Sequence, residues 1–176
     1  MRTTAPAYRS VWSEYASVPL RLMLGFAFCY HGFPKLFASG GHEQFTAQLT
    51  ELGVAAPGAM AWLIGILEFA GGIALILGAL VTVVSALLAI EMAVAAATVH
   101  ASAGFSFMNV IGTGGGAPQF GMPGYEVNLL YIAGLLTLMM IDAGPASLDA
   151  LWLRRRFGRV TRRADVSAEE PVTTRV

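Results

Sequence analysis

Four long stretches of apolar residues alternate with polar segments along the chain. They cover residues 18–37, 57–80, 82–101 and 127–143. A helix of about 20 apolar residues is long enough to cross the hydrocarbon core of a bilayer. The pattern therefore predicts an all-α, polytopic membrane protein built as a bundle of four transmembrane helices.

The composition agrees with this prediction. Hydrophobic residues make up 56% of the chain and charged residues only 12%, which is too apolar for an ordinary soluble domain. We therefore expect a single membrane domain over residues 18–144, surrounded by lipid, and no nucleic acid as a partner.

The positive charges are segregated along the sequence. Six arginines fall within residues 154–163, and Arg2, Arg9 and Arg21 lie at the N-terminal side of the first apolar run, whereas residues 38–56 and 102–124 contain no lysine or arginine. Because cytoplasmic segments of membrane proteins carry the excess of positive charge, we expect both termini in the cytoplasm. An even number of crossings leads to the same topology.

The segments outside the apolar runs have distinct characters. We expect residues 1–17 to lie at the cytoplasmic interface, residues 145–163 to form an interfacial amphipathic helix with a basic segment, and residues 164–176 to be a disordered tail. Residues 42–52 place Phe45, Leu49 and Leu52 at helical spacing, which predicts a surface helix or a lid over a pocket. Residues 102–124 are rich in glycine and predict a flexible loop.

Glu68 lies about ten residues into the second run, where it is the only charged residue. A carboxylate at this depth is costly unless it is protonated, paired or open to a cavity. On the first run, Arg21, Phe28, His31 and Lys35 share one helical face. Glu68 is therefore expected to face these basic residues, either as a structural ion pair or as a group that exchanges protons.

The remaining ionisable residues divide by their expected depth. His100 and Glu126 lie at the outer ends of the third and fourth runs, so we expect an outer cluster with the ligand-binding candidates His31, Lys35, Glu68, His100 and Glu126. We expect structural polar roles for Arg21, Glu91, Asp142 and Asp149. Snorkelling or ion pairing is an equally good reading for those near the interfaces.

The sequence offers few cofactor ligands. Cys29 is the only cysteine, so there is no Cys-X-X-Cys redox pair and no cysteine set for an iron–sulfur cluster. His31, His42 and His100 lack the spacing of a metal site. We find no haem ligand pair and no flavin motif, so electrons for any redox reaction are expected to come from a partner subunit.

Several motifs together resemble the DoxX family of small four-helix membrane proteins. They are the stretch from Arg21 to Gly25, the His-Gly-Phe-Pro-Lys-Leu-Phe element that starts at His31, the Glu-Phe-Ala-Gly-Gly element that starts at Glu68, His100, Glu126, and the Gly-Pro-Ala-Ser-Leu-Asp element that ends at Asp149. The resemblance covers residues 19–153. Glu91 departs from the family pattern, which usually has an apolar or weakly polar residue there.

The resemblance implies a multi-pass subunit of a respiratory or redox complex in the bacterial inner membrane, since family members are associated with quinol oxidases and thiosulfate:quinone oxidoreductase. A quinone head group needs hydrogen-bond donors for its carbonyl oxygens and a route for protons. His31 and Lys35 are the expected donors, and Glu68 is the expected proton-exchanging group. Whether the subunit is itself catalytic stays open.

Two other functions fit the sequence. The chain is also consistent with a structural or assembly anchor for a redox partner, held through its arginine-rich tail and outer loops. A proton-coupled small exporter is the third possibility, although the chain has no internal repeat of the kind found in many transporters.

Overall fold

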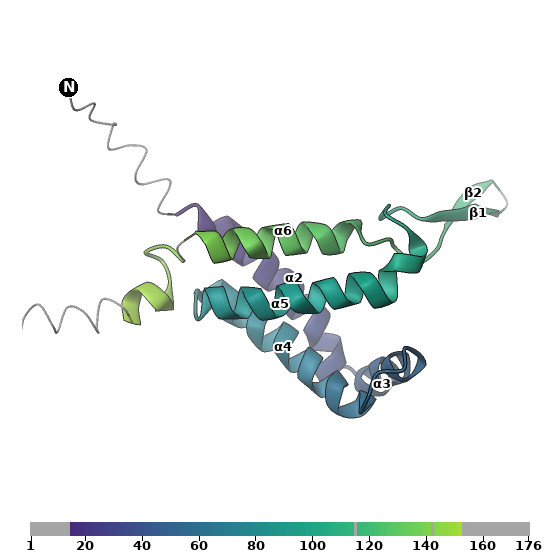
Figure 1. Cartoon of the computed structure of the whole chain (residues 1–176), viewed down its shortest axis with the longest axis horizontal. Helices are drawn as coiled ribbons and strands as arrows, with labels where there is room; N and C mark the ends of the chain where they lie inside the picture. Colours follow the sequence, from purple (N-terminus) through teal and green to yellow (C-terminus); the bar gives the residue numbers. More distant parts are fainter. Residues whose placement is uncertain (1–14, 115, 142, 153–176) are drawn as a thin grey trace, which may run out of the picture.

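The computed structural model describes residues 15–114, 116–141 and 143–152 (Figure 1). The predictions for residues 1–14, for Asp142, for the arginines of residues 154–163 and for the tail lie outside these described residues. Within them helices dominate, as predicted, and a helix lies in each of the four apolar runs.

The four long helices are α2 (Ser17–Phe37), α4 (Pro57–Leu77), α5 (Val81–Ala95) and α6 (Glu126–Met140). Pro57 occupies the first turn of α4, where its missing N–H costs nothing. Gly78 ends the same helix with a φ of +68°, a conformation that glycine adopts without strain. Helix α5 continues as a π-helical turn, Ala96–His100, and a 3₁₀ turn, Ala101–Ala103.

Two of the described helices are long and apolar enough to cross a membrane. They are Pro57–Leu77 and Val81–Ala103, the second being α5 with its two short continuations. Helix α6 is apolar but has only 15 residues. Large apolar side chains, including Met23, Ile90 and Leu130, are exposed on the outer faces, which suits a hydrocarbon environment better than water. The structure thus indicates a membrane protein, while four crossings and cytoplasmic termini stay predictions.

Helices α2 and α4 cross closely because glycines line their contact. A Cβ atom added at Gly25 would lie 2.6 Å from the carbonyl oxygen of Gly72, and one at Gly32 would lie 2.5 Å from the backbone nitrogen of Phe69. In lipid, small residues let helix backbones approach and gain packing contacts that apolar burial alone does not supply. This glycine seam fixes α2 against α4 over most of its length.

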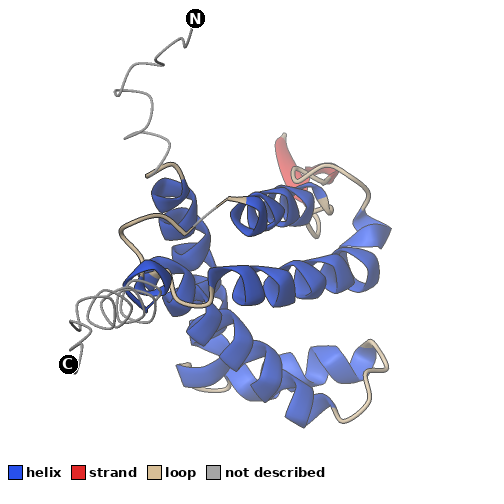
Figure 2. Ribbon diagram, turned by 60° about the vertical axis from the view of Figure 1, so that its left-hand side comes forward, coloured by secondary structure: helices blue, strands red, loops and turns tan. Residues whose placement is uncertain are grey.

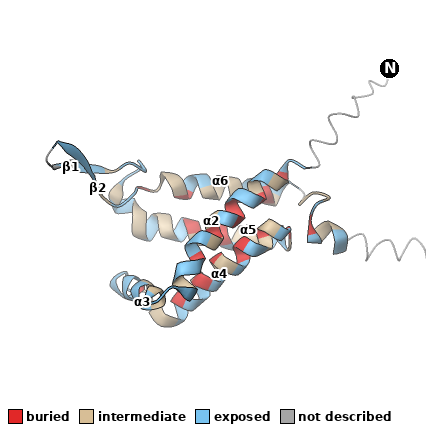
Figure 3. Ribbon diagram, turned by 180° about the vertical axis from the view of Figure 1, so that it is seen from behind, coloured by how far each residue is buried: buried red, intermediate tan, exposed pale blue. Residues whose placement is uncertain are grey.

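The second pair, α5 and α6, lies side by side in Figure 1 and packs against the first through a leucine-rich core. Phe28, Leu75, Leu88 and Leu135 are fully buried there, and the buried residues form an inner stripe along the helices (Figure 3).

The predicted surface helix is present as α3 (Gly41–Glu51), which packs on α2 and α4. Leu49 is buried, whereas Leu52, expected on the same face, lies just beyond the helix and is exposed.

The expectation of a flexible loop at residues 102–124 is wrong for part of that segment. Strands β1 (Val110–Gly114) and β2 (Ala117–Phe120) form an antiparallel hairpin in which Val110 pairs with Phe120 (Figure 2). Gly116 takes a φ of +88° in the turn, a conformation that few other residues adopt readily. The hairpin is the one departure from an all-α architecture among the described residues.

Candidate functional site

Lys35 and Glu68 form an ion pair inside the helix bundle. Lys35 lies in the last turn of α2, Glu68 lies in the middle of α4, and the Lys35 Nζ donates hydrogen bonds to both carboxylate oxygens. The Glu68 side chain is 3% exposed and that of Lys35 is 20% exposed. Lys35 is the only lysine in the sequence. A buried carboxylate is tolerated in such a place when a cation pairs with it.

Helix α3 covers the end of this pair. The Lys35 Nζ lies 4.6 Å from the centre of the Phe45 ring, a cation–π contact. The His42 ring stacks on Trp62 of α4 with centroids 4.5 Å apart. The His42 Nδ1 and the Thr46 Oγ1 of α3 are buried and have no hydrogen-bond partner among the described residues.

Glu91 of α5 also interacts with the ion pair. Its carboxyl group is within hydrogen-bonding reach of the Glu68 carboxyl group and also interacts electrostatically with Lys35. The Glu91 Oε2 is buried and has no hydrogen-bond donor among the described residues. Two acids therefore face one lysine at the contact between α2, α4 and α5.

His31 and Tyr131 complete the group. His31 interacts electrostatically with Glu68 and Lys35, and its ring lies nearly perpendicular to that of Tyr131 of α6, with centroids 6.4 Å apart. His31 is exposed at the bundle surface, whereas Glu68 is buried. We call His31, Lys35, Glu68, Glu91 and Tyr131 the Lys35 cluster.

The structure does not bring together all five residues of the predicted outer cluster. The His100 Nδ1 lies 2.8 Å from the Pro123 carbonyl oxygen, and the Glu126 Oε2 accepts a hydrogen bond of 2.9 Å from the Phe107 N–H. Both side chains thus hold the segment that carries the β-hairpin, and neither makes an ion pair or hydrogen bond with Lys35 among the described residues. The sequence predicted both residues near Lys35 because they lie at a similar depth along their helices. In the structure, backbone groups of the segment that carries the hairpin are their hydrogen-bond partners.

A second polar group lies at the opposite end of α2. Arg21, which is 2% exposed, donates hydrogen bonds to the backbone carbonyls of Leu75 (3.2 Å), Ala146 (2.9 Å) and Ala143. Ser17 also donates to the Ala143 carbonyl, at 3.0 Å. The guanidinium group therefore ties α2 and α4 to the segment that follows α6.

Asp149 closes this second group. Its two carboxylate oxygens accept hydrogen bonds from the N–H groups of Leu80 (2.8 Å) and Val81 (3.0 Å), which are the free donors at the start of α5. A Cβ atom at Gly78 would lie 2.5 Å from the Ser147 Cβ, so the contact requires glycine. We call Ser17, Arg21, Ser147 and Asp149 the Arg21 cluster.

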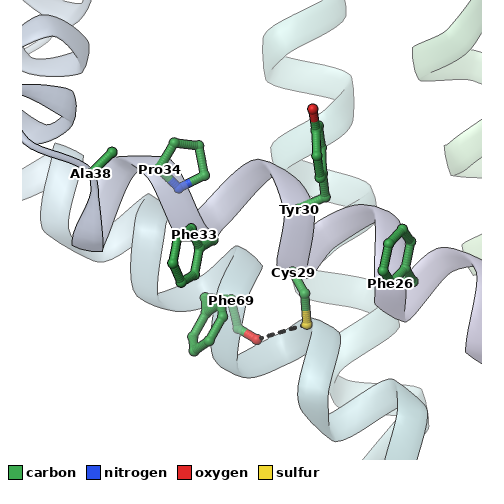
Figure 4. Close-up of a pocket in the computed structure, with 7 residues that line it drawn as sticks. All are labelled: Phe26, Cys29, Tyr30, Phe33, Pro34, Ala38 and Phe69. Atoms are coloured by element: carbon green, nitrogen blue, oxygen red, sulfur yellow. Dashed lines mark hydrogen bonds between the residues drawn. The ribbon is translucent and has the colours of Figure 1, made fainter.

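An apolar groove of about 500 Å³ runs along the outside of α2 and α4 (Figure 4). The Cys29 Sγ donates a weak hydrogen bond of 3.5 Å to the Phe69 carbonyl oxygen in its wall. The groove is lined by Phe26, Cys29, Tyr30, Phe33, Pro34, Ala38 and Phe69. Pro34 and Phe69 directly adjoin Lys35 and Glu68 in sequence, so the groove and the Lys35 cluster lie at the same level on different faces of the two helices.

Sequence reasoning assigned a structural role to Glu91 and did not single out Tyr131. Tyr131 stands within an otherwise apolar stretch of α6, and a phenol in such a run was the available signal. Among the residues that the structure describes, no three His, Cys, Asp or Glu side chains gather as metal ligands.

Comparison with known proteins supports the resemblance seen in the motifs. No curated protein and no solved structure matches the chain. The family model named DoxX matches residues 16–101, a range that contains α2 to α5 and with them Arg21, His31, Lys35, Glu68 and Glu91. The DoxX resemblance inferred from the sequence is thus confirmed over residues 16–101.

Proposed function

We propose that this protein is an integral-membrane subunit of a redox complex that binds quinone or quinol at the Lys35 cluster. In this proposal α2, α4, α5 and α6 all cross the bacterial inner membrane with both termini in the cytoplasm. The observation that carries the proposal is the partly buried Lys35–Glu68 ion pair, which interacts with a second acid, Glu91, and with an exposed histidine, His31.

The side chains of this cluster suit a quinone head group. The Lys35 ammonium group and an N–H of His31 are donors for a carbonyl oxygen, and the Tyr131 hydroxyl both donates and accepts. Oxidation of a quinol releases two electrons and two protons. Glu68, which interacts electrostatically with His31, would take up one proton and the His31 imidazole the other, and the electrons would pass to a partner subunit.

The apolar groove provides a place for an isoprenoid tail. Its walls are mostly aromatic, and the Phe33 and Phe69 rings in them have centroids 6.1 Å apart. The neighbouring Phe37 ring contacts both, with centroids 5.2 Å away. An apolar chain in such a groove leaves the polar head free to lie against α2 near His31. Sites of this kind combine a mostly apolar surface with a few polar groups that fix the orientation of the ligand.

The proposal is tested with purified protein in lipid nanodiscs, by extracting bound quinone and by titrating a short-chain quinol analogue. We expect Lys35→Met and His31→Gln to weaken binding and Glu51→Gln, an exposed acid on α3, to leave it unchanged. Equal binding by all four proteins, or no binding by any, would refute the proposal.

A second candidate function, that of a membrane anchor for a redox partner, rests on the Arg21 cluster. The cluster holds residues 143–152 firmly against the ends of α2 and α4, and the arginine-rich residues 154–163 follow directly. Deletion of residues 153–176 separates the two functions: an anchor loses its partner on co-purification, whereas quinone binding persists.

A further inference from the structure

We infer that Glu68 and Glu91 form a carboxyl pair that holds a single proton between them, with Lys35 as the counter-cation. This inference deepens the proposed function, because it assigns to Glu91 a place in the proton route of the same site. Its test does not depend on quinone.

The charge of the site favours one shared proton. Two ionised acids beside one lysine would leave one uncompensated negative charge among apolar helices, which is strongly unfavourable. One proton shared by the two acids makes the site neutral. Two carboxyl groups at close range likewise resist simultaneous ionisation.

The hydrogen bonding of Glu68 and Glu91 also favours one shared proton. The Glu68 and Glu91 carboxyl groups are within hydrogen-bonding reach, and two carboxyl groups can bond to each other only when one carries a proton. Lys35 donates to both oxygens of Glu68, so Glu68 is the ionised partner and Glu91 the protonated one. The buried Glu91 Oε2 receives no hydrogen bond from the described residues, so no donor stabilises an ionised Glu91 at this oxygen.

The other titratable groups around the pair do not supply a second fixed cation. From α2 the site receives Lys35 and His31, and from α6 it receives Tyr131 through its contact with His31. Arg21 is bound to carbonyls at the opposite end of α2. His31 is therefore the one alternative counter-charge among the described residues, and the experiment includes it.

A neutral site that holds one proton can lose or gain a proton when a charged ligand binds. Loss of the proton leaves one net negative charge, and gain of a second leaves one net positive charge. An anionic ligand at His31 and Lys35 is thus expected to bind together with a proton.

The test is infrared spectroscopy of the protein in lipid nanodiscs, which detects the C=O stretch of protonated carboxylic acids at neutral pH. We expect one buried carboxylic acid in the native protein and loss of its band in both Glu68→Gln and Glu91→Gln. Lys35→Met, which removes the cation, should raise the band about twofold because both acids then carry protons. Glu51→Gln and His31→Gln should leave the band unchanged.

Retention of the band in Glu91→Gln, or its absence from the native protein, would overturn the inference. If Lys35→Met fails to fold, as judged by its helical circular dichroism, the near-isosteric glutamine variants still decide the matter. A band that appears only in His31→Gln would make a protonated His31 the second counter-cation and would also contradict the two-acid assignment. Quinone binding without the band would leave the proposed function standing alone, and the band without quinone binding would leave the pair alone.

Discussion

The two ends of α2 each carry a cation, a buried arginine at one end and a half-buried lysine at the other, and the two differ in how fully their surroundings are hydrogen-bonded. At one end, Arg21 donates to several backbone carbonyls and the acid of its cluster, Asp149, accepts from two N–H groups at the start of α5. At the other end, Lys35 faces two acids, Glu68 and Glu91, and the buried Glu91 Oε2 has no donor within the described part of the chain. The Arg21 cluster is saturated, and the Lys35 cluster is not.

This difference separates a structural role from a chemical one. A buried polar network in which every group is satisfied rigidifies the helices that it joins. A network with surplus acid and an exposed histidine has groups left over for a proton or a ligand. We therefore expect substitutions in the Arg21 cluster to lower the stability of the protein, and substitutions in the Lys35 cluster chiefly to change binding.

The largest effect is expected for Arg21→Met. Loss of the guanidinium group leaves several buried carbonyls without a donor, at about 1–3 kcal/mol each, so we expect the free energy of unfolding to fall by about 3–5 kcal/mol. Reversible unfolding in mixed detergent micelles measures this change. A loss below about 1 kcal/mol would show that water or lipid replaces the arginine and that the cluster is not structural.

Asp149→Ala is expected to have the next largest effect. It removes the acceptor for the Leu80 and Val81 N–H groups at the start of α5, and loss of such a cap typically costs about 1–2 kcal/mol. The same unfolding assay applies, and quinol binding should stay at its native level. Weakened binding in a folded Asp149→Ala protein would contradict the separation of the two clusters.

Lys35→Met is expected to change ligand binding more than stability. The stability should fall by only about 1 kcal/mol, because Glu68 can take up a proton when its cation is removed, whereas loss of a charged hydrogen-bond donor to the ligand weakens affinity about 10-fold or more. Titration calorimetry with a quinol analogue, beside the unfolding assay, measures both. A large loss of stability with unchanged affinity would assign Lys35 to structure instead.

The smallest change in stability is expected for Glu91→Gln. Since the substitution keeps the shape of the side chain and removes surplus acid, the free energy of unfolding should stay within about 0.5 kcal/mol of the native value. The proton uptake that accompanies binding of an anionic ligand should nevertheless decrease, which measurement of binding heats in buffers of different ionisation enthalpy detects. A strongly destabilised Glu91→Gln protein would indicate that this acid holds α5 in place.

Much of the helical architecture could be predicted from the sequence because apolar runs of bilayer length leave few alternatives to a helix. The pairing of Glu68 with the basic face of α2 followed from depth and helical periodicity. The β-hairpin could not be found in this way, because its short strands lie in a segment whose glycines signal only a loop. The positions of His100 and Glu126 depended on hydrogen bonds to that same segment, and depth alone does not reveal such partners.

Glu91 shows a further limit of the sequence. The depth of Glu91 was evident from the sequence. Which face of α5 contacts α4, however, depends on how the glycine seam packs α2 against α4 and on how the leucine-rich core packs α5 and α6 against them. Helical periodicity within one segment does not fix that rotation. The contact between Glu91 and Glu68 therefore could not be predicted from the sequence alone.

The central claim is that ligand binding takes place at the Lys35 cluster, and the single lysine of the chain allows a direct test. Isotopic labelling of lysine gives one side-chain NMR signal, that of Lys35, in the protein reconstituted in nanodiscs. We predict that a quinol analogue shifts this signal in a saturable manner and that the shift is lost in His31→Gln. A Lys35 signal that stays unchanged up to saturating analogue would contradict the claim.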